Sequence, residues 1–215
     1  MNKWSLGIDV GGTFTDIVLT DGAGALHTTK TPSTKDQSDG VLNGIGKIAE
    51  QVGETAEGLL SDCGIVVHGT TVATNALLEY RGAKVGLLTT DGFRDELEFR
   101  RSYKESTFNP RLEAPEAICP RRMRVGIPER VSKDAEVLIP LDEDAVRKAV
   151  TFLKEEGVQA IAVCYLFSFI SPDHERRTAE IINEMAPEIY VTLSCDVLPE
   201  IREYERVSTT VVNAY

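Results

Sequence analysis

The sequence predicts an α/β fold whose mixed sheet is opened by antiparallel hairpins and followed by an α-β-α-β portion. Short apolar segments separated by turn residues fill residues 5–30, which is typical of hairpins. Residues 140–194 instead alternate between helical and strand patterns, which favours parallel pairing. The composition agrees, because 42% of the 215 residues are hydrophobic and 27% are charged, an ordinary globular balance.

The first elements are three short strands, expected at residues 5–10, 15–20 and 25–30. The second and third are joined by Asp21-Gly22-Ala23-Gly24, which is a hairpin signal. A helix is expected over residues 36–52, because apolar side chains recur there at helical spacing.

The next elements are a strand at 64–67, a helix at 71–81 and a strand at 83–88. Gly82 would suit the C′ position after that helix. The resulting order, β-β-β-α-β-α-β, differs from a simple Rossmann alternation. We therefore expect a mixed sheet whose first hairpins hold phosphate.

Residues 91–121 lose this periodicity and alternate basic residues with acids and prolines. A long irregular segment in a compact domain is often functional, so it is either a functional excursion or a solvated loop. Regular elements then return: a helix at 143–156, a strand at 158–163, a helix from Ser171-Pro172 to Met185, and a strand at 189–193. A last helix is expected within 199–215.

The net charge of −11 disfavours binding to nucleic acid, whose backbone is also negative. The sequence has no apolar run of about 18 residues and no secretory leader, so we expect a cytoplasmic protein without a membrane span. The cysteines, Cys63, Cys119, Cys164 and Cys195, are too widely spaced for a zinc site and are expected to be structural.

A glycine-containing turn separates the first two strands, in the sequence Asp9-Val10-Gly11-Gly12-Thr13-Phe14-Thr15-Asp16. Glycines let the backbone approach an anion and adopt positive φ, and successive N–H groups can form an anion nest. Asp9 fits such a site only with a bridging cation such as Mg²⁺. Thr13 and Thr15 can donate hydroxyl hydrogen bonds. The alternative is an ordinary hairpin with a structural threonine; neither a P-loop nor a Gly-x-Gly-x-x-Gly motif is present.

A second polar motif, His68-Gly69-Thr70-Thr71-Val72-Ala73-Thr74-Asn75, follows the strand at 64–67 and opens a helix. The end of a strand that leads into a helix is a common anion or substrate site. Thr70, Thr71 and Asn75 are therefore candidates, and His68 could move a proton near neutral pH. The alternatives are that the threonines only cap the helix and that the histidine is structural.

A third motif is the charged segment Glu200–Arg206. Glu203 and Arg206 are three residues apart on a helix, so they either pair with each other or lie at the edge of a substrate cleft. His174 is expected to be exposed, and neither it nor His27 has a ligand-like neighbour that would indicate a zinc site.

Together with the first two motifs, Pro120-Arg121-Arg122, Pro128-Glu129-Arg130-Val131 and Tyr204–Tyr215 resemble the N-terminal region of the hydantoinase A / 5-oxoprolinase / acetone (acetophenone) carboxylase family. The likeness covers nearly the whole chain. It implies an actin-like ATPase fold with a ribonuclease-H-like sheet, and the order of elements above agrees with it.

The resemblance also implies how the chain is organised. Residues 1–195 would form the N-terminal domain, and 196–215 would be the start of the second, ATPase domain or a C-terminal helix. Family members are much longer, so we expect a larger polypeptide or a tight assembly to continue past Tyr215. A split small subunit is equally possible. The missing part would hold the second phosphate loop and the adenine pocket, so this chain alone should bind ATP weakly or not at all.

The activity that the resemblance implies uses ATP and Mg²⁺, or Mn²⁺, to phosphorylate a carbonyl or enol oxygen for hydrolysis of a cyclic amide of the hydantoin or 5-oxoproline type. The alternatives are a subunit of an ATP-dependent ketone carboxylase, which residues 100–111 slightly favour, and a non-catalytic assembly subunit. A sugar or acyl kinase of the same superfold is a further possibility. The implied partners are a B-type subunit in a hetero-oligomer and a small carbonyl substrate.

In this scheme Asp9 would hold the metal, and Gly11, Gly12 and Thr13 would cradle the transferred phosphate, with Thr15 nearby. His68, Thr70 and Thr71 would line the acceptor side, with Asn75, Glu203 and Arg206 toward the substrate.

Overall fold

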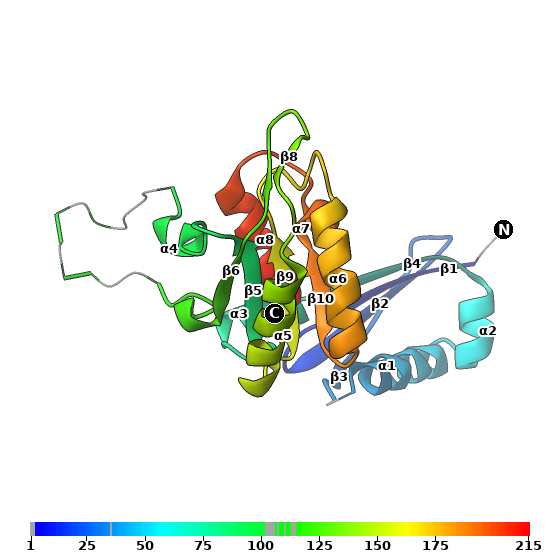
Figure 1. Ribbon diagram of the computed structural model, residues 1–215. Coiled ribbons are helices and arrows are strands. Elements are labelled where there is room, and N and C mark those ends of the chain that lie inside the picture. Colours follow the sequence, from blue (N-terminus) through cyan, green and yellow to red (C-terminus); the bar gives the residue numbers. More distant parts are fainter. Residues whose placement is uncertain (1–2, 35, 102–105, 107, 110, 113–114) are drawn as a thin grey trace. The chain divides into compact units, whose positions relative to one another are not determined.

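The chain folds into two compact units, Met1–Arg81 and Gly82–Tyr215, which are described in turn (Figure 1). The computed structural model describes residues 3–34, 36–101, 106, 108–109, 111–112 and 115–215. Within them, no helix has the length and apolar character needed to cross a membrane.

The first unit contains a four-stranded mixed sheet in the order β3-β2-β1-β4. Its strands are β1 (Trp4–Val10), β2 (Phe14–Asp21), β3 (Leu26–Pro32) and β4 (Cys63–Thr70). The first three strands pair antiparallel, whereas β4 runs parallel to β1. The predicted opening hairpins and the mixed character of the sheet are therefore confirmed.

Side chains alternate between the two faces of this sheet, and α1 (Gln37–Gln51) covers one of them. The Asp36 side chain caps α1 by accepting a hydrogen bond from the Ser38 N–H group. The covered face carries the core of the unit, including Trp4, Leu6, Ile8, Val10, Ile17 and Leu19. The opposite face carries Ser5, Gly7 and Asp9 from β1 and is not covered by α1.

Two short helices complete this unit, α2 (Ala56–Ser61) and α3 (Val72–Leu78). The sequence analysis missed α2, because six residues are too few to show a helical period. The predicted helix at 71–81 ends earlier than expected, and Tyr80 takes the positive φ of +53° that was assigned to Gly82. Gly82 instead lies against the Tyr215 ring, where an added Cβ would come within 2.3 Å of it.

The second unit is built on a four-stranded parallel sheet in the order β10-β9-β5-β6. The strands are β5 (Val85–Thr90), β6 (Arg124–Ile127), β9 (Ala160–Cys164) and β10 (Tyr190–Leu193). The two central strands, β5 and β9, are buried along their whole length, as is typical of parallel strands covered on both faces. The parallel pairing is confirmed, but the strand predicted at 83–88 belongs to this sheet and not to the first.

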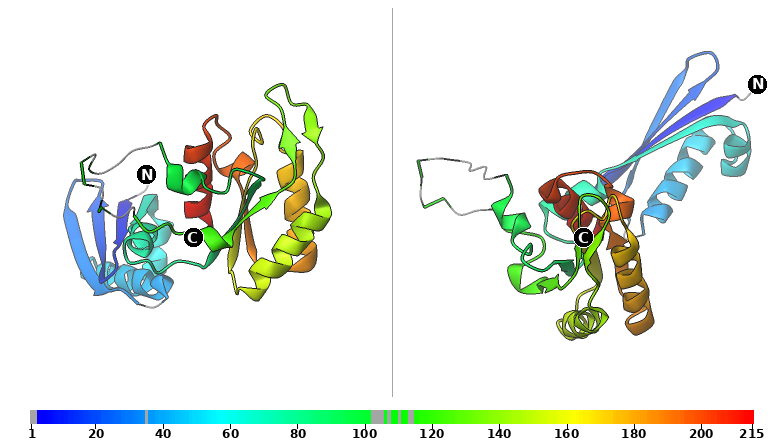
Figure 2. Two further views of the ribbon diagram at one scale, coloured as in Figure 1. Left: turned by 60° about the vertical axis from the view of Figure 1, so that its left-hand side comes forward. Right: turned by 45° about the horizontal axis from the view of Figure 1, so that its top comes forward.

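Helices cover both faces of the parallel sheet, with α5 (Glu143–Glu155) and α6 (Asp173–Met185) on one face and α8 (Glu203–Ala214) on the other (Figure 2). Asp142 caps α5 through a hydrogen bond from Ala145 N–H. Pro172, and not Ser171, holds the N-cap position of α6, so the predicted cap is off by one residue.

The remaining elements are short: α4 (Glu96–Phe99), the 3₁₀ turn η1 (Arg121–Met123), β7 (Arg130–Val131), β8 (Val137–Ile139) and α7 (Ser194–Val197). Of the irregular segment predicted over 91–121, residues 102–105, 107, 110 and 113–114 lie outside the described residues. The carboxylase hint drawn from residues 100–111 falls partly on them and stays a prediction.

The four cysteines are free thiols, and burial raises the pKa of Cys119 to about 12.

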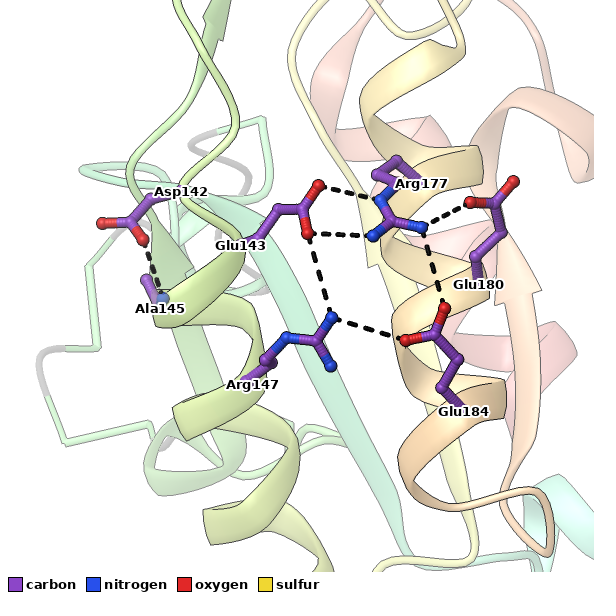
Figure 3. A network of polar contacts seen from close by, with 7 residues as sticks. All are labelled: Asp142, Glu143, Ala145, Arg147, Arg177, Glu180 and Glu184. Atoms are coloured by element: carbon purple, nitrogen blue, oxygen red, sulfur yellow. Dashed lines mark hydrogen bonds and ion pairs between the residues drawn. The ribbon is translucent and has the colours of Figure 1, made fainter.

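A network of ion pairs joins α5 to α6 on the surface of the second unit (Figure 3). The Arg177 guanidinium forms a two-pronged contact with the Glu143 carboxylate, at 2.8 and 2.9 Å, and a third bond with Glu180 at 2.7 Å. Arg147 contacts Glu184 at 3.4 Å and Glu143 at 3.9 Å. Because all five side chains remain partly exposed, solvent weakens each pair.

This network predicts a stability difference that depends on pH. The hydrogen bond from Arg177 holds the pKa of the Glu143 carboxyl below its ordinary value of 4.5. A carboxyl with a lowered pKa stabilises the fold above that ordinary value, and the contribution is lost as pH falls through the lowered value. We therefore expect Arg177→Gln to lower the Tm at pH 7, with the deficit shrinking progressively once pH falls below 4.5.

Arg176→Gln provides the matched control, because it removes the same charge from the same helix. Arg176 is exposed and makes no ion pair with any described residue, so its Tm should stay close to that of the wild type at every pH. Thermal unfolding followed by circular dichroism checks both variants. An Arg177→Gln deficit of equal size at pH 7 and at about pH 3 would contradict the assignment.

Candidate phosphate-binding site

The turn between β1 and β2 is held tightly by main-chain contacts. The Gly11 N–H group donates to the Phe14 carbonyl oxygen at 2.9 Å. Ser33, at the end of β3, braces the turn twice: its hydroxyl donates to the Gly11 oxygen at 2.7 Å, and its N–H group donates to the Thr13 oxygen at 2.9 Å. The N–H groups of Gly12 and Thr13 have no acceptor among the described residues, and both residues are exposed. The turn therefore presents two unused donors to solvent.

Both glycines of this turn are needed for space. A Cβ on Gly11 would lie 3.0 Å from the Phe14 carbonyl oxygen, and a Cβ on Gly12 would lie 3.0 Å from the Asn75 side-chain nitrogen. Neither glycine has a positive φ, so the expectation of a left-handed backbone here was wrong. What the glycines supply is close approach of other groups to the turn.

The two polar motifs meet at one edge of the sheet, because β1 and β4 are parallel neighbours. The Thr71 N–H group and the Thr70 hydroxyl both donate to the Val10 carbonyl oxygen, at 3.2 and 3.3 Å. The side chain of Asn75 lies against Gly12. Hydrogen bonds between the two motifs therefore fix the position of the glycine turn.

Asp9 lies on the face of the sheet that α1 does not cover. Its register partner on β4 is Gly69, and a Cβ built on Gly69 would be 3.8 Å from the Asp9 carboxylate. His68 is the register partner of Ile8, so it points to the opposite face, although it is exposed. The prediction that His68 and Asp9 act together is therefore wrong, because their side chains lie on opposite faces of the sheet.

The two threonines of the second motif differ in role. Thr70 accepts a hydrogen bond from Val72 N–H at 3.2 Å through its hydroxyl, which stabilises the start of α3 as the capping alternative proposed. Thr71 holds the N-cap position, and its carbonyl oxygen accepts from Asn75 N–H at 2.8 Å, but its side chain makes no capping hydrogen bond. Its hydroxyl lies 3.3 Å from the Asn75 side-chain nitrogen, so these two side chains form one polar group beside Gly12.

Thr15, predicted to help bind the cofactor, is fully buried. Its hydroxyl has no hydrogen-bond partner among the described residues and lies under α1, 3.5 Å from a Cβ built on Gly40. Alternation along β2 places Thr15 on the covered face, so it has no exposed oxygen for a phosphate. This corrects its assignment to the phosphate contacts.

Sequence reasoning missed Asp16 as a neighbour of Asp9. The two residues are register partners on β1 and β2, so their carboxylates lie on the same uncovered face. Lys30 is 3.2 Å from the Asp16 carboxylate and balances its charge. The spacing in Asp-x-Gly-Gly-Thr-x-Thr-Asp contained this signal, because a three-residue turn brings its two ends into register.

Two side chains assigned to the substrate edge, Glu203 and Arg206, belong to the second unit. Arg206 is buried and donates to the carbonyl oxygens of Tyr165 at 2.7 Å and Glu200 at 3.4 Å. It makes no ion pair with Glu203 among the described contacts, so the simple i,i+3 pair is absent. Burial, and next the Glu203 charge, raise the pKa of Glu96. Glu203 thus lies close enough to Glu96 for their charges to interact.

The two other histidines, His174 and His27, both contact neighbouring side chains. His174 was expected to be exposed, but it is largely buried and its Nδ1 atom lies 2.8 Å from Glu129. His27 packs edge-on against the Trp4 ring, with the ring centres 6.3 Å apart. Across the described residues, no group of three or more His, Cys, Asp or Glu side chains could hold a metal ion. A cation beside Asp9 would therefore need further oxygen ligands from water or phosphate.

Comparison with known proteins identifies a family and several relatives of this chain. A family model described as the hydantoinase/oxoprolinase N-terminal region matches residues 5–186. Caprolactamase subunit alpha of Pseudomonas jessenii is 42% identical, over 99% of this chain and 31% of that subunit. The acetophenone carboxylase gamma subunit of Aromatoleum aromaticum is 39% identical, over 98% of this chain and 31% of that subunit.

Two solved structures share the fold. The crystal structure of the ATP-dependent caprolactamase from P. jessenii superposes with a TM-score of 0.85 at 41% identity, over 98% of this chain and 31% of that one. A nucleotide-free structure of acetone carboxylase superposes with a TM-score of 0.90 at 26% identity, over 100% of this chain and 32% of that one. This chain thus spans about a third of the length of these relatives. It belongs to the hydantoinase/oxoprolinase N-terminal region family.

Proposed function

We propose that this chain is the phosphate-binding part of an ATP-dependent enzyme that phosphorylates a carbonyl or enol oxygen for hydrolysis of a cyclic amide. One observation carries the proposal: the turn at Gly11–Thr13 offers two unused N–H donors beside the exposed carboxylate of Asp9. Unused main-chain donors attract anions, and a carboxylate beside them suits a metal-bound polyphosphate. The names of the relatives, ATP-dependent caprolactamase and 5-oxoprolinase, support both the nucleotide and the substrate class.

Each residue at the turn has a specific part in this proposal. The N–H groups of Gly12 and Thr13 would donate to oxygens of the transferred phosphate, and the missing Cβ of Gly11 keeps the turn tight. Asp9 is an oxygen ligand of the type that Mg²⁺ or Mn²⁺ prefers, and it would hold the cation directly or through water. Such a cation, when bound, neutralises charge on the phosphates. Thr71 and Asn75 border the turn and would orient the acceptor.

The wider assignments are proposals of the same kind. The sheet order β3-β2-β1-β4 with α1 on one face supports an actin-like ATPase fold with a ribonuclease-H-like sheet. We assign residues 1–195 to the N-terminal domain and 196–215 to the start of the next domain or a C-terminal helix. The named alpha, beta and gamma subunits among the relatives support a hetero-oligomer. The B-type partner subunit and the cytoplasmic location stay predictions. The substrate-side roles of Glu203 and Arg206 stay predictions.

A second candidate function is ATP-dependent carboxylation of a ketone. It is favoured by the 39% identity with the acetophenone carboxylase gamma subunit and by the fold shared with acetone carboxylase. The two functions begin with the same phosphorylation and differ in whether water or a carboxylating species reacts next. The phosphate turn therefore serves both equally.

Product analysis of the complete enzyme that contains this chain tests the proposal. The enzyme would be given Mg·ATP with 5-oxoproline, a hydantoin or caprolactam in turn, and with acetone or acetophenone plus bicarbonate. We expect phosphate release that depends on one cyclic amide and matches the ring-opened product in amount. Release that requires a ketone and bicarbonate would establish the second candidate. A stable phosphorylated product would indicate a kinase, and the absence of binding heat with Mg·ATP would indicate an assembly subunit.

A further inference from the structure

A row of charged side chains crosses the uncovered face of the first sheet beside the phosphate turn. Asp9 on β1 is the register partner of Asp16 on β2, and Asp16 is the register partner of Lys30 on β3. Register partners on neighbouring strands point to the same face, so all three side chains lie on the side that α1 leaves open. The row therefore begins at the proposed metal ligand and ends at a cation.

Lys30 is the cation that this face of the sheet provides. All residues of the four strands are described, and Lys30 is the only lysine or arginine among them. The two histidines of these strands, His27 and His68, are register partners of the buried residues Leu19 and Ile8, so they belong to the opposite face. Bound phosphate groups are usually neutralised by lysine or arginine side chains together with a metal ion. Lys30 is the side chain on this face that meets that need.

The side chain of Lys30 extends toward the turn. Its Nζ atom lies 3.2 Å from the Asp16 carboxylate and 5.0 Å from the centre of the Phe14 ring. Phe14 directly follows Thr13, whose N–H group is one of the two unused donors of the turn. Phe14 lies two residues before Asp16 on β2, so its ring is on the same uncovered face, where the residue is 43% exposed. The positive charge of Lys30 is thus held between Asp16 and the residue next to the turn.

A simpler interpretation is that Lys30 only forms a surface ion pair on an edge strand. β3 is the edge strand of this sheet, and lysine is common at such edges because it discourages further pairing. The side chains of Lys30 and Asp16 are 56% and 49% exposed, and ion pairs of this kind contribute little to stability. This interpretation would fit a lysine anywhere along β3. It gives no reason for a lysine in line with two aspartates and beside the turn.

We propose that Lys30 is a further binding residue for the transferred phosphate of ATP. Its ammonium group contacts Asp16 in the structure. A phosphate held by the N–H groups of Gly12 and Thr13 carries more negative charge than that carboxylate, so it attracts the ammonium group away from Asp16. The flexible four-carbon stem of an exposed lysine permits this movement. The inference rests on the proposed function, because it assigns a role at the same phosphate site.

Calorimetric titration of the complete enzyme with Mg·ATP and with Mg·ADP, in the absence of an acceptor, tests this role. ADP lacks the terminal phosphate, so only ATP can make the contact. We expect Lys30→Gln to weaken the binding of Mg·ATP at least about tenfold and that of Mg·ADP less than about twofold. Lys30→Arg keeps the positive charge and should retain most of the affinity for ATP.

Two control variants separate the phosphate contact from other effects of charge. Lys47→Gln removes an exposed charge from α1 in the same unit, at a residue without an ion pair to any described residue, and should bind both nucleotides as the wild type does. Asp16→Asn breaks the ion pair but keeps the lysine, so it should retain its affinity for ATP. Because Lys30 and Asp16 are exposed, both variants should keep a Tm close to that of the wild type.

The possible results distinguish this inference from the proposed function. Normal binding of ATP by Lys30→Gln would refute the inference alone, as would an equal loss of affinity for ATP and ADP. A loss in Lys30→Arg or Asp16→Asn as large as that in Lys30→Gln would also overturn it, because the charge of Lys30 would then not be the cause. A wild-type enzyme that binds neither nucleotide would refute the proposed function, and this inference with it.

Discussion

Replacing Asp9 by asparagine is expected to reduce ATP turnover by the complete enzyme at least about tenfold while the fold stays intact. The variant keeps the size of the side chain but removes the negative charge that would hold the cation. Catalysis of phosphoryl transfer depends mainly on positioning and charge stabilisation, so a misplaced or missing cation slows the reaction directly. Steady-state phosphate release and calorimetric titration with Mg·ATP measure the effect.

The structure explains why Asp9→Asn should fold normally. Asp9 is exposed on the uncovered face of the sheet, and its carboxylate accepts no hydrogen bond from a described residue. The matched control is Asp62→Asn, which removes one charge from an exposed position after α2 in the same unit. It should leave turnover and Tm unchanged. Normal turnover in Asp9→Asn would refute the metal role, and a large fall in its Tm would mean that the carboxylate is structural.

The elements of the first unit that could be predicted are those whose side chains form one clear pattern. The opening strands alternate apolar and polar residues, and their turn is marked by Asp21 and two glycines, so both their type and their pairing followed from local sequence. The helix predicted at 36–52 lies within one residue of α1, Gln37–Gln51. The meeting of the two polar motifs was implied only by the family resemblance, because no local pattern showed that the first and fourth strands are neighbours.

The faces on which the site residues lie could not be predicted. The sequence analysis ended the fourth strand at residue 67, whereas β4 continues to Thr70 and places His68 inside the strand. In a strand, one residue decides the face, so this shift separates His68 from Asp9. Thr15 was assigned to the phosphate contacts from its hydroxyl alone. It lies two residues from the buried Ile17 on β2, so both side chains are on the same, covered face.

Residues whose partners are distant in sequence were also misjudged. His174 and Arg206 were treated as surface groups because charged residues usually are. Their partners come from elsewhere in the chain: Glu129 for His174, and the Tyr165 carbonyl oxygen for Arg206. No local pattern indicates such a partner. The same reasoning applies to Glu175, whose burial leads to the largest stability effect expected here.

Glu175 lies in the first turn of α6, where an acidic residue usually faces solvent and complements the helix dipole. Here it is fully buried. Its carboxylate accepts hydrogen bonds from Tyr165 N–H at 2.8 Å, from the Ser194 hydroxyl at 2.6 Å and from Cys195 N–H at 2.9 Å. These donors follow the ends of β9 and β10, so one side chain ties the ends of two strands to α6.

The Glu175→Ala variant of the 215-residue chain is expected to lose about 3–5 kcal/mol of unfolding free energy. Alanine would leave the Tyr165 N–H group buried and the Cys195 N–H group partly buried without their acceptor, while the Ser194 hydroxyl would keep only Ser168 as a partner. Each buried donor left without an acceptor costs about 1–3 kcal/mol. Urea unfolding followed by circular dichroism measures the loss. Asp173→Ala is the matched control, because it removes an exposed acid from the same turn of α6, and it should cost less than about 1 kcal/mol.

The Glu175→Gln variant separates the charge of this side chain from its geometry. Glutamine keeps one acceptor oxygen in nearly the same volume, but its NH₂ group would face one of the three donors. If the carboxylate acts as a shared acceptor, glutamine should lie between the wild type and alanine in stability, because only part of the donor set is lost. If Glu175→Ala were no less stable than Asp173→Ala, the three contacts would contribute little. The strand ends would then be held by packing of the surrounding apolar core alone.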